Sequence, residues 1–255
     1  FDGLPAAEWY RISADTGDPY AADDAAHAFL AEDRPKRALL VGSGNLFLEK
    51  ALRLAGAEVT LLSPEDAETW AKTAAAERPD LIVVDGAEPP ASGEWARALA
   101  ASPALFIRSG YGGEEMGAPA GPYQVAEHPV NRYLSFSEVL VGAWLQPDPP
   151  FGTPIVSSAD GPLVIADTAN GRPRLTLTFA LHHSDWPLRS EFPVFVRNAL
   201  EWLTESRGGS LGRAVAGAEM EIEFDALTAA ARWVNVETGG STDALTAGGR
   251  PAAGQ

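Results

Sequence analysis

The sequence predicts an α/β fold built on a doubly wound, mostly parallel sheet with a β-rich C-terminal half. Between residues 37 and 108, short apolar runs alternate with amphipathic segments of helical periodicity, which is the arrangement of successive βαβ units. The apolar runs carry almost no polar residues, as is typical of strands covered by helices on both faces. After residue 109 the chain becomes rich in glycine, and then in strand-forming segments separated by turn sequences.

The predicted parallel half has recognisable starts for its helices. Asn45 is a suitable N-cap for the first helix, whose apolar residues recur at spacings of three and four. Ser63 caps the second helix, with Pro64 at its first position and Asp66 as its capping-box partner. We expect strands at residues 37–41, 57–62, 80–85 and 104–108, and helices that begin at residues 46, 64 and 93.

The second half is expected to be mostly strand. Asn170-Gly171 is a strong hairpin signal, and a final helix is expected over residues 193–203, with Pro193 in its first turn. The expected strands cover residues 133–144, 154–158, 163–166 and 174–181, and the buried stripe of the helix consists of Val196, Ala199, Leu200 and Leu203.

Both ends of the chain lie outside this pattern. Residues 1–34 contain one short strand signal, at 9–12, and favour an extension or linker; the alternative is an extra edge strand on the main sheet. The last part of the chain favours a linker (204–210), two flanking strands of an incomplete β segment (218–224 and 232–236) and a disordered tail (239–255). The predicted domains are therefore residues 1–34, 35–205 and 206–255.

Composition excludes several classes of function. The chain has 19 Lys and Arg against 35 Asp and Glu, a net charge of −16, which argues against binding to nucleic acid or to an anionic membrane surface. It has no cysteine, which excludes a disulfide, a thiolate nucleophile and cysteine-bound metal. No apolar run approaches the roughly 20 residues that cross a bilayer. We expect no cofactor, and Phe1 in place of an initiator Met favours a piece of a longer protein.

The Gly42-Ser43-Gly44-Asn45 sequence lies between a strand and a helix, where a phosphate-binding loop would lie. It does not match a dinucleotide fingerprint, because Phe47 stands where the third glycine is needed. A tight turn with a helix cap is the favoured interpretation, and a small anion site on the exposed backbone N–H groups is the alternative.

Ser109 follows the fourth predicted strand, a common position for nucleophiles in α/β folds. The elbow pattern requires glycine two residues before and two after the serine, and Ile107 and Tyr111 stand there. A serine hydrolase would have to use His182 or His183 as its base, with Asp185 nearby. Its test is a hydrogen bond between Ser109 Oγ and an imidazole nitrogen.

His182 and His183 are expected at the end of a strand, where adjacent side chains point to opposite faces. They would then not share a metal ion, although a metal site with His128 remains an alternative. Asp85 and Glu88 follow the third strand at the carboxyl edge of the sheet, where ligands bind in open α/β folds. A solvated edge or loop cap is the favoured interpretation of these two carboxylates.

A resemblance to a known family is carried by four segments. These segments are similar to part of bacterial membrane proteins that carry a von Willebrand factor A domain. They are R-A-L-L-V-G-S-G-N-L-F-L-E-K-A-L at residues 37–52, D-L-I-V-V-D-G at 80–86, E-H-P-V at 127–130 and the segment 179–203 (F-A-L-H-H-S-D-W-P-L-R to N-A-L-E-W-L). In those proteins this part resembles a class I glutamine amidotransferase-like, flavodoxin-type domain. The closing strand and helix are also similar to those of the trehalose-utilisation family.

The resemblance implies a membrane-anchored parent protein, with the domain on the extracytoplasmic side. The D-x-S-x-S adhesion motif is absent, so the chain is not the A domain itself. A true amidotransferase needs a cysteine at its elbow with His and Glu behind it. This chain has no cysteine, and the His-x-Glu pattern is replaced by His183-Ser184-Asp185. Glutamine hydrolysis through a thioester is therefore excluded.

These observations favour a non-catalytic interaction or ligand-sensing domain, whose partners are proteins or other domains of the parent chain. The alternatives are a degenerate serine hydrolase that uses Ser109 and His183, and a small-molecule or sugar-binding module. A binding role requires a concave pocket at the carboxyl edge. The residues expected to line that crevice are Ser43, Gly44, Asn45, Asp85, Ser109, His182 and His183.

Overall fold

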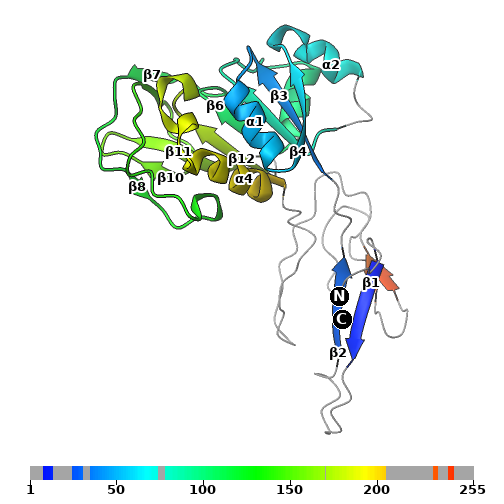
Figure 1. The fold of residues 1–255 in the computed structure, drawn as a ribbon. Coiled ribbons are helices and arrows are strands. Elements are labelled where there is room, and N and C mark those ends of the chain that lie inside the picture. Colours follow the sequence, from blue (N-terminus) through cyan, green and yellow to red (C-terminus); the bar gives the residue numbers. More distant parts are fainter. Residues whose placement is uncertain are drawn as a thin grey trace. The chain divides into compact units, whose positions relative to one another are not determined.

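The computed structural model describes residues 8–13, 25–30, 35–73, 78–169, 171–204, 232–234 and 241–243. The chain divides into two units, Phe1–Lys36 and Arg37–Gln255. In the first unit, β1 (Glu8–Ser13) and β2 (Ala25–Leu30) form an antiparallel pair, drawn in blue in Figure 1. These two strands make a sheet of their own, so the alternative of an extra edge strand on the main sheet is wrong.

An eight-stranded mixed sheet forms the centre of the second unit (Figure 1), with the strand order β4-β3-β5-β6-β12-β11-β10-β8. The pairs β3–β5, β5–β6 and β6–β12 are parallel, whereas β12–β11, β11–β10 and β10–β8 are antiparallel. The α/β class and the parallel centre are thus confirmed. The strands are β3 (Lys36–Gly42), β4 (Ala57–Leu62), β5 (Leu81–Asp85), β6 (Ala104–Ile107), β8 (Gln124–Val125), β10 (Thr153–Ser157), β11 (Pro162–Ala169) and β12 (Arg172–Leu177).

Helices cover both faces of the sheet. Side chains of α1 (Leu46–Leu54) and α4 (Glu191–Thr204) share one apolar core with Ala38 and Leu40 of β3. Side chains of α2 (Ala67–Thr73) and α3 (Glu94–Ala100) share a second core with Leu39 and Val41. Alternate residues of β3 therefore enter different cores, which is why the strand has no polar face.

The predicted caps of the first two helices are confirmed. Asn45 Oδ1 accepts a hydrogen bond from the backbone N–H of Leu48 at 3.1 Å. Ser63 Oγ accepts one from the backbone N–H of Asp66 at 3.3 Å, and the 3-10 turn η1 (Pro64–Asp66) leads into α2. Each hydroxyl or amide oxygen satisfies one of the N–H groups that a helix start leaves without an internal partner.

The expected strand at residues 133–144 is wrong. This segment follows the 3-10 turn η2 (Pro129–Asn131) as a loop, with Tyr133 and Phe136 in the left-handed region at φ 67° and 54°. Strand begins only at β9 (Trp144–Pro147), which pairs with β7 (Gly113–Met116) in a separate two-stranded sheet. Apolar residues in the segment pack from a loop, so their presence did not require a strand.

The hairpin at Asn170-Gly171 is confirmed, because Ala169 pairs with Arg172 and Gly171 has φ 72°. β12 ends at Leu177, so the expected strand over 174–181 is four residues too long. The chain continues in two 3-10 turns, η3 (Leu181–His183) and η4 (Trp186–Leu188), before α4.

Little of the C-terminal segment is described. The expected strand at 218–224 lies outside the described residues, as does the expected linker at 204–210 except for Thr204, which ends α4. β13 (Arg232–Val234) pairs with β14 (Ser241–Asp243), so the strand expected at 232–236 is confirmed over its first three residues. Residues 241–243 form a strand, contrary to the disorder expected there. In the described part of the chain, no helix is both long and apolar enough to cross a membrane.

Candidate functional site

The carboxyl ends of β3, β5, β6 and β12 meet at one edge of the sheet, because these neighbouring strands run parallel. The segments that leave this edge are residues 42–45, 85–88, 108–113 and 178–185. Ligands in open α/β sheets bind at this edge. The segments predicted to form the crevice therefore do leave the sheet at one edge.

The loop at Ser43 and Gly44 is tied to the neighbouring strand by Asn45. Asn45 Nδ2 donates to Asp85 Oδ2 at 2.9 Å while its Oδ1 caps α1. Burial raises the pKa of Asp85, and the hydrogen bond from Asn45 and the nearby His182 act in the opposite direction. A Cβ at Gly42 would lie 2.9 Å from the backbone oxygen of Asp85, so only glycine allows this approach. The geometry supports the turn-and-cap interpretation, because an anion bound here would face the Asp85 carboxyl.

Ser109 does not meet the test for a catalytic serine. Its side chain is only 1% exposed, and its hydroxyl donates to the backbone oxygen of Ala87. Among the described residues, no hydrogen bond joins Ser109 to an imidazole. The left-handed residue at this turn is Arg108, at φ 45°, and β6 leads to β7 without the helix that a nucleophile elbow requires.

The two adjacent histidines lie together, contrary to the expectation of opposite faces. His182 and His183 occupy the turn η3 instead of a strand, and their ring centroids are 4.3 Å apart. Both residues are exposed. The ring of His128 instead packs 5.0 Å from that of Trp202 on α4. No group of three or more His, Cys, Asp or Glu that could hold a metal ion occurs among the described residues.

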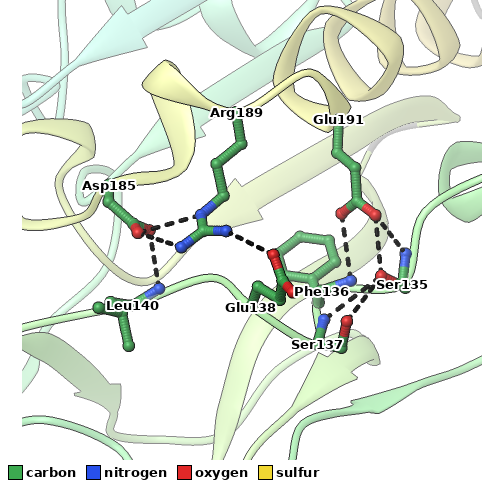
Figure 2. Close-up of polar contacts among 8 residues, drawn as sticks. All are labelled: Ser135, Phe136, Ser137, Glu138, Leu140, Asp185, Arg189 and Glu191. Atoms are coloured by element: carbon green, nitrogen blue, oxygen red, sulfur yellow. Dashed lines mark hydrogen bonds and ion pairs between the residues drawn. The ribbon is translucent and has the colours of Figure 1, made fainter.

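The carboxylate of Asp185 is hydrogen-bonded to a loop and to Arg189 (Figure 2). Its Oδ1 accepts the backbone N–H of Leu140 at 2.8 Å, and its Oδ2 accepts Arg189 Nε at 3.0 Å. Arg189 also pairs with Glu138 at 3.1 Å. The hydrogen bond from Arg189 is the main reason why the pKa of Asp185 is lowered. The serine-hydrolase alternative would need Asp185 to orient His183, and the structure gives the carboxylate these other partners instead.

Glu191, the first residue of α4, holds the other end of this loop (Figure 2). Its carboxylate accepts the backbone N–H groups of Ser135 and Phe136, at 3.1 and 3.2 Å, and the Ser135 hydroxyl at 2.8 Å. The ring of Phe136 is fully buried, with its centroid 4.5 Å from that of Trp186. We call residues 135–140 the clamped loop.

Two hollows lie on the face of the sheet that carries α2 and α3. The first has a volume of about 380 Å³, and Glu68, Val84 and Trp95 contribute to its lining. The second, of about 650 Å³, lies between residues 88–91, the side of α3 and residues 110–112, with Phe106 and Arg174 from the sheet. We call this second hollow the Arg174 pocket. None of the seven residues predicted to line the crevice lines either hollow. Only their neighbours on the loops that follow β5 and β6 do so, among them Glu88 and Tyr111.

Arg174 is the residue that sequence reasoning missed. It stands on β12 across from Asp167 of β11, and its guanidinium carbon lies 5.8 Å from the centroid of the Phe106 ring. Nη2 donates to the backbone oxygen of Leu99 at 3.5 Å, whereas Nε is buried without a hydrogen-bond partner. Burial lowers the pKa of Arg174, and Asp167 opposes this change. β12 also contains Arg172 and Thr176, so no local sequence signal distinguished Arg174 as a site residue.

Tyr111 forms part of the opposite wall of the pocket. Its hydroxyl donates to the backbone oxygen of Leu145 at 3.3 Å, and its ring centroid lies 5.5 Å from that of Phe151. Burial raises the pKa of Tyr111 far above the ordinary value for tyrosine. The phenol therefore stays protonated at physiological pH, and it contributes ring surface to the wall.

Comparison with known proteins supports the fold and leaves the activity open. No protein-family model and no curated sequence matches the chain. A cytoplasmic protein from Salmonella typhimurium LT2 is similar in structure, with 12% identity, a TM-score of 0.51, and coverage of 66% of this chain and 99% of that one. A second cytoplasmic protein from Salmonella typhimurium has 10% identity and a TM-score of 0.50, over 66% and 98% of the two chains.

A looser likeness is to a GMP synthase-like protein from Thermoplasma acidophilum. It has 16% identity and a TM-score of 0.46, over 69% of this chain and 98% of that one. At their identities the two Salmonella structures show a shared mixed α/β fold and no more. Fold alone does not define an activity, so the function has to be argued from the site.

Proposed function

We propose that this chain is a non-catalytic ligand-sensing domain that holds a small molecule in the Arg174 pocket. One observation carries the proposal: a hollow of about 650 Å³, within the usual size range of small-molecule sites, extends from the loops that follow β5 and β6 along α3 to Arg174. Its walls combine apolar side chains with one half-buried cationic group, Arg174, the combination that binding sites use for affinity and orientation.

The proposal of a non-catalytic domain is supported by the state of the side chains that catalysis would need, which are either absent or engaged in other contacts. The sequence has no cysteine. The Ser109 hydroxyl is buried and engaged with the backbone oxygen of Ala87, and the Asp185 carboxylate is engaged with Arg189 and Leu140. A nucleophile needs an adjacent base and an orienting group, and these contacts give Ser109 and Asp185 other partners.

Amide chemical shifts of the ¹⁵N-labelled full chain test this function directly. A mixture of small fragments, neutral and charged, is expected to shift the backbone signals of residues 88–91 and 110–112 and to leave those of Ser43 and Asn45 unchanged. Shifts confined to residues outside the pocket would contradict the proposal. So would covalent labelling of Ser109 by a fluorophosphonate, with Ser137, an exposed serine of the clamped loop, as the matched control position.

Contact with a partner protein or a neighbouring domain is the second candidate, favoured by exposed apolar side chains. Leu140 and Leu188 are 69% and 74% exposed, and the backbone of both residues is hydrogen-bonded to Asp185. A photoreactive residue placed at position 188 of the native protein in cells is expected to give a discrete cross-linked product. Position 54, where Leu54 is 77% exposed on α1, is the control, and equal cross-linking from both positions would contradict a specific surface.

The cellular setting is proposed from the family resemblance. We propose that the parent protein is membrane-anchored and bacterial and presents this domain on the extracytoplasmic side. The test is fractionation of cells that express the native gene, followed by protease treatment of spheroplasts. The domain is expected to sediment with the membranes and to be digested from outside. Recovery in the soluble cytosolic fraction would overturn this setting without affecting the pocket.

A further inference from the structure

We propose that the Arg174 pocket is selective for small organic acids, molecules with one carboxylate on a flat apolar body. This inference rests on the proposed function and names the ligand class for the same site. Three features of the pocket support it: the unused donors of Arg174, the walls around them and the charges at the rim.

The guanidinium of Arg174 has donor capacity that the protein does not use. It carries five N–H donors, of which the described residues engage one, with the backbone oxygen of Leu99 at 3.5 Å. Nε is buried without a partner. Asp167 favours the charged form of Arg174, but no carboxylate of the described residues lies within 4.0 Å of the guanidinium, the distance that defines an ion pair. A ligand carboxylate would accept two parallel hydrogen bonds from the terminal nitrogens Nη1 and Nη2, a planar fork that the ammonium group of a lysine lacks.

The walls next to the guanidinium suit a flat apolar body. Phe106, Tyr111, Leu99 and Pro89 contribute to the lining. Gly110 allows this arrangement, because it has φ 82° and a Cβ there would lie 3.0 Å from Cδ1 of the Phe106 ring. Flat rings pack well between proline, leucine and aromatic side chains, and the apolar surface they bury adds to the affinity from the charge.

The charges at the rim oppose ligands of higher negative charge. Glu88 lines the pocket, and Arg174 is the one cationic residue among its lining residues. The chain as a whole carries a net charge of −16, which repels polyanions at long range. A phosphate or nucleotide would need more compensating charge than one arginine supplies, whereas a monocarboxylate needs one partner.

Calorimetric titrations of the full chain with benzoate, benzamide and inorganic phosphate test separately whether the pocket requires a negative charge and whether it requires an apolar body. Benzamide has the shape of benzoate without its charge, and phosphate has charge without an apolar body. Benzoate is expected to bind at least tenfold more tightly than either. Arg174→Gln is expected to abolish this preference, and Arg174→Lys to retain part of it. Arg197→Gln, which removes an exposed α4 arginine paired with Glu201, is the matched control and should bind benzoate as the wild type does.

The possible failures of the two proposals are distinguishable. Equal affinity for benzoate and benzamide, or benzoate binding that survives Arg174→Gln, would overturn the organic-acid class while leaving a ligand pocket in place. Phosphate binding equal to that of benzoate would overturn the requirement for an apolar body. Fragment-induced shifts that are absent from residues 88–91 and 110–112 would instead overturn the proposed function. If Arg174→Gln does not fold, the comparison of benzoate with benzamide and phosphate on the wild-type chain still tests the proposed ligand class.

Discussion

Residues 37–107 and the clamped loop at residues 135–140 belong to one unit but are held in place by different contacts. In the first region the central strands β3, β5 and β6 are buried on both faces, and Ile82, Val83 and Ala104 are 0% exposed. In the second, the carboxylates of Asp185 and Glu191 bind backbone N–H groups of a segment about 50 residues away in sequence (Figure 2). Apolar burial therefore defines one region, and a few charged side chains together with one buried ring define the other.

The largest expected effect comes from removing that ring. Phe136→Ala should lower the free energy of unfolding by about 4 kcal/mol, because it leaves a cavity where Phe136 packs against Trp186. Tyr133→Ala is the control, since Tyr133 is also aromatic and left-handed but is 85% exposed; its effect should stay within about 0.5 kcal/mol. Urea denaturation measures both. Equal losses would mean that burial of Phe136 does not hold the loop.

Asp185→Asn should have a smaller effect that depends on pH. The folded protein lowers the pKa of Asp185, so its stabilising contribution is complete above the ordinary aspartate pKa of about 3.9 and is lost as the pH falls through the lower folded value. The difference in unfolding free energy between wild type and variant should therefore be largest at neutral pH and disappear in strong acid. Thermal melts between pH 2 and 7 measure it, and a difference that grows in acid would contradict the arrangement in Figure 2.

Ser109→Ala should cost about 1 kcal/mol, the usual contribution of one buried hydrogen bond, because the backbone oxygen of Ala87 loses its donor. Benzoate affinity should stay within twofold of the wild type. Calorimetry and urea denaturation of the same sample give both values. A large loss of binding with stability retained would point to a direct role for Ser109 at the site.

Arg174→Met should have the smallest effect on stability, within about 1 kcal/mol of the wild type in either direction. The change removes a buried Nε that has no partner and keeps an apolar stem on β12. Urea denaturation provides the measurement. Destabilisation comparable to that of Phe136→Ala would show that Arg174 holds the fold, and its proposed role in binding would lose its main support.

The same contrast explains which features the sequence could predict. β4 and the start of α1 follow from local signals, an apolar run and a cap at Asn45. The clamped loop depends on contacts between Glu191 and Ser135 and between Asp185 and Leu140, which no local pattern encodes. Without these contacts, the apolar residues of the segment at 133–144 were indistinguishable from a strand.

The sequence could predict which loops lie together at one edge of the sheet, but it could not predict which residues line the pocket. A parallel centre places the loops after β5 and β6 together, and Glu88 and Tyr111 of those loops do line the hollow. Arg174 enters from the start of β12, and its position depends on the parallel pairing of β12 with β6. The histidines were misplaced because the chain leaves the strand at Leu177 and forms η3.

A crystal structure of the full chain with benzoate tests the central claim most directly. The account predicts the carboxylate within about 3.2 Å of the guanidinium nitrogens of Arg174, with hydrogen-bond geometry, and the ring against Phe106 and Pro89. Benzoate bound instead at the loop of Ser43 and Asn45, or an Arg174 guanidinium engaged by a carboxylate of the protein itself, would contradict it.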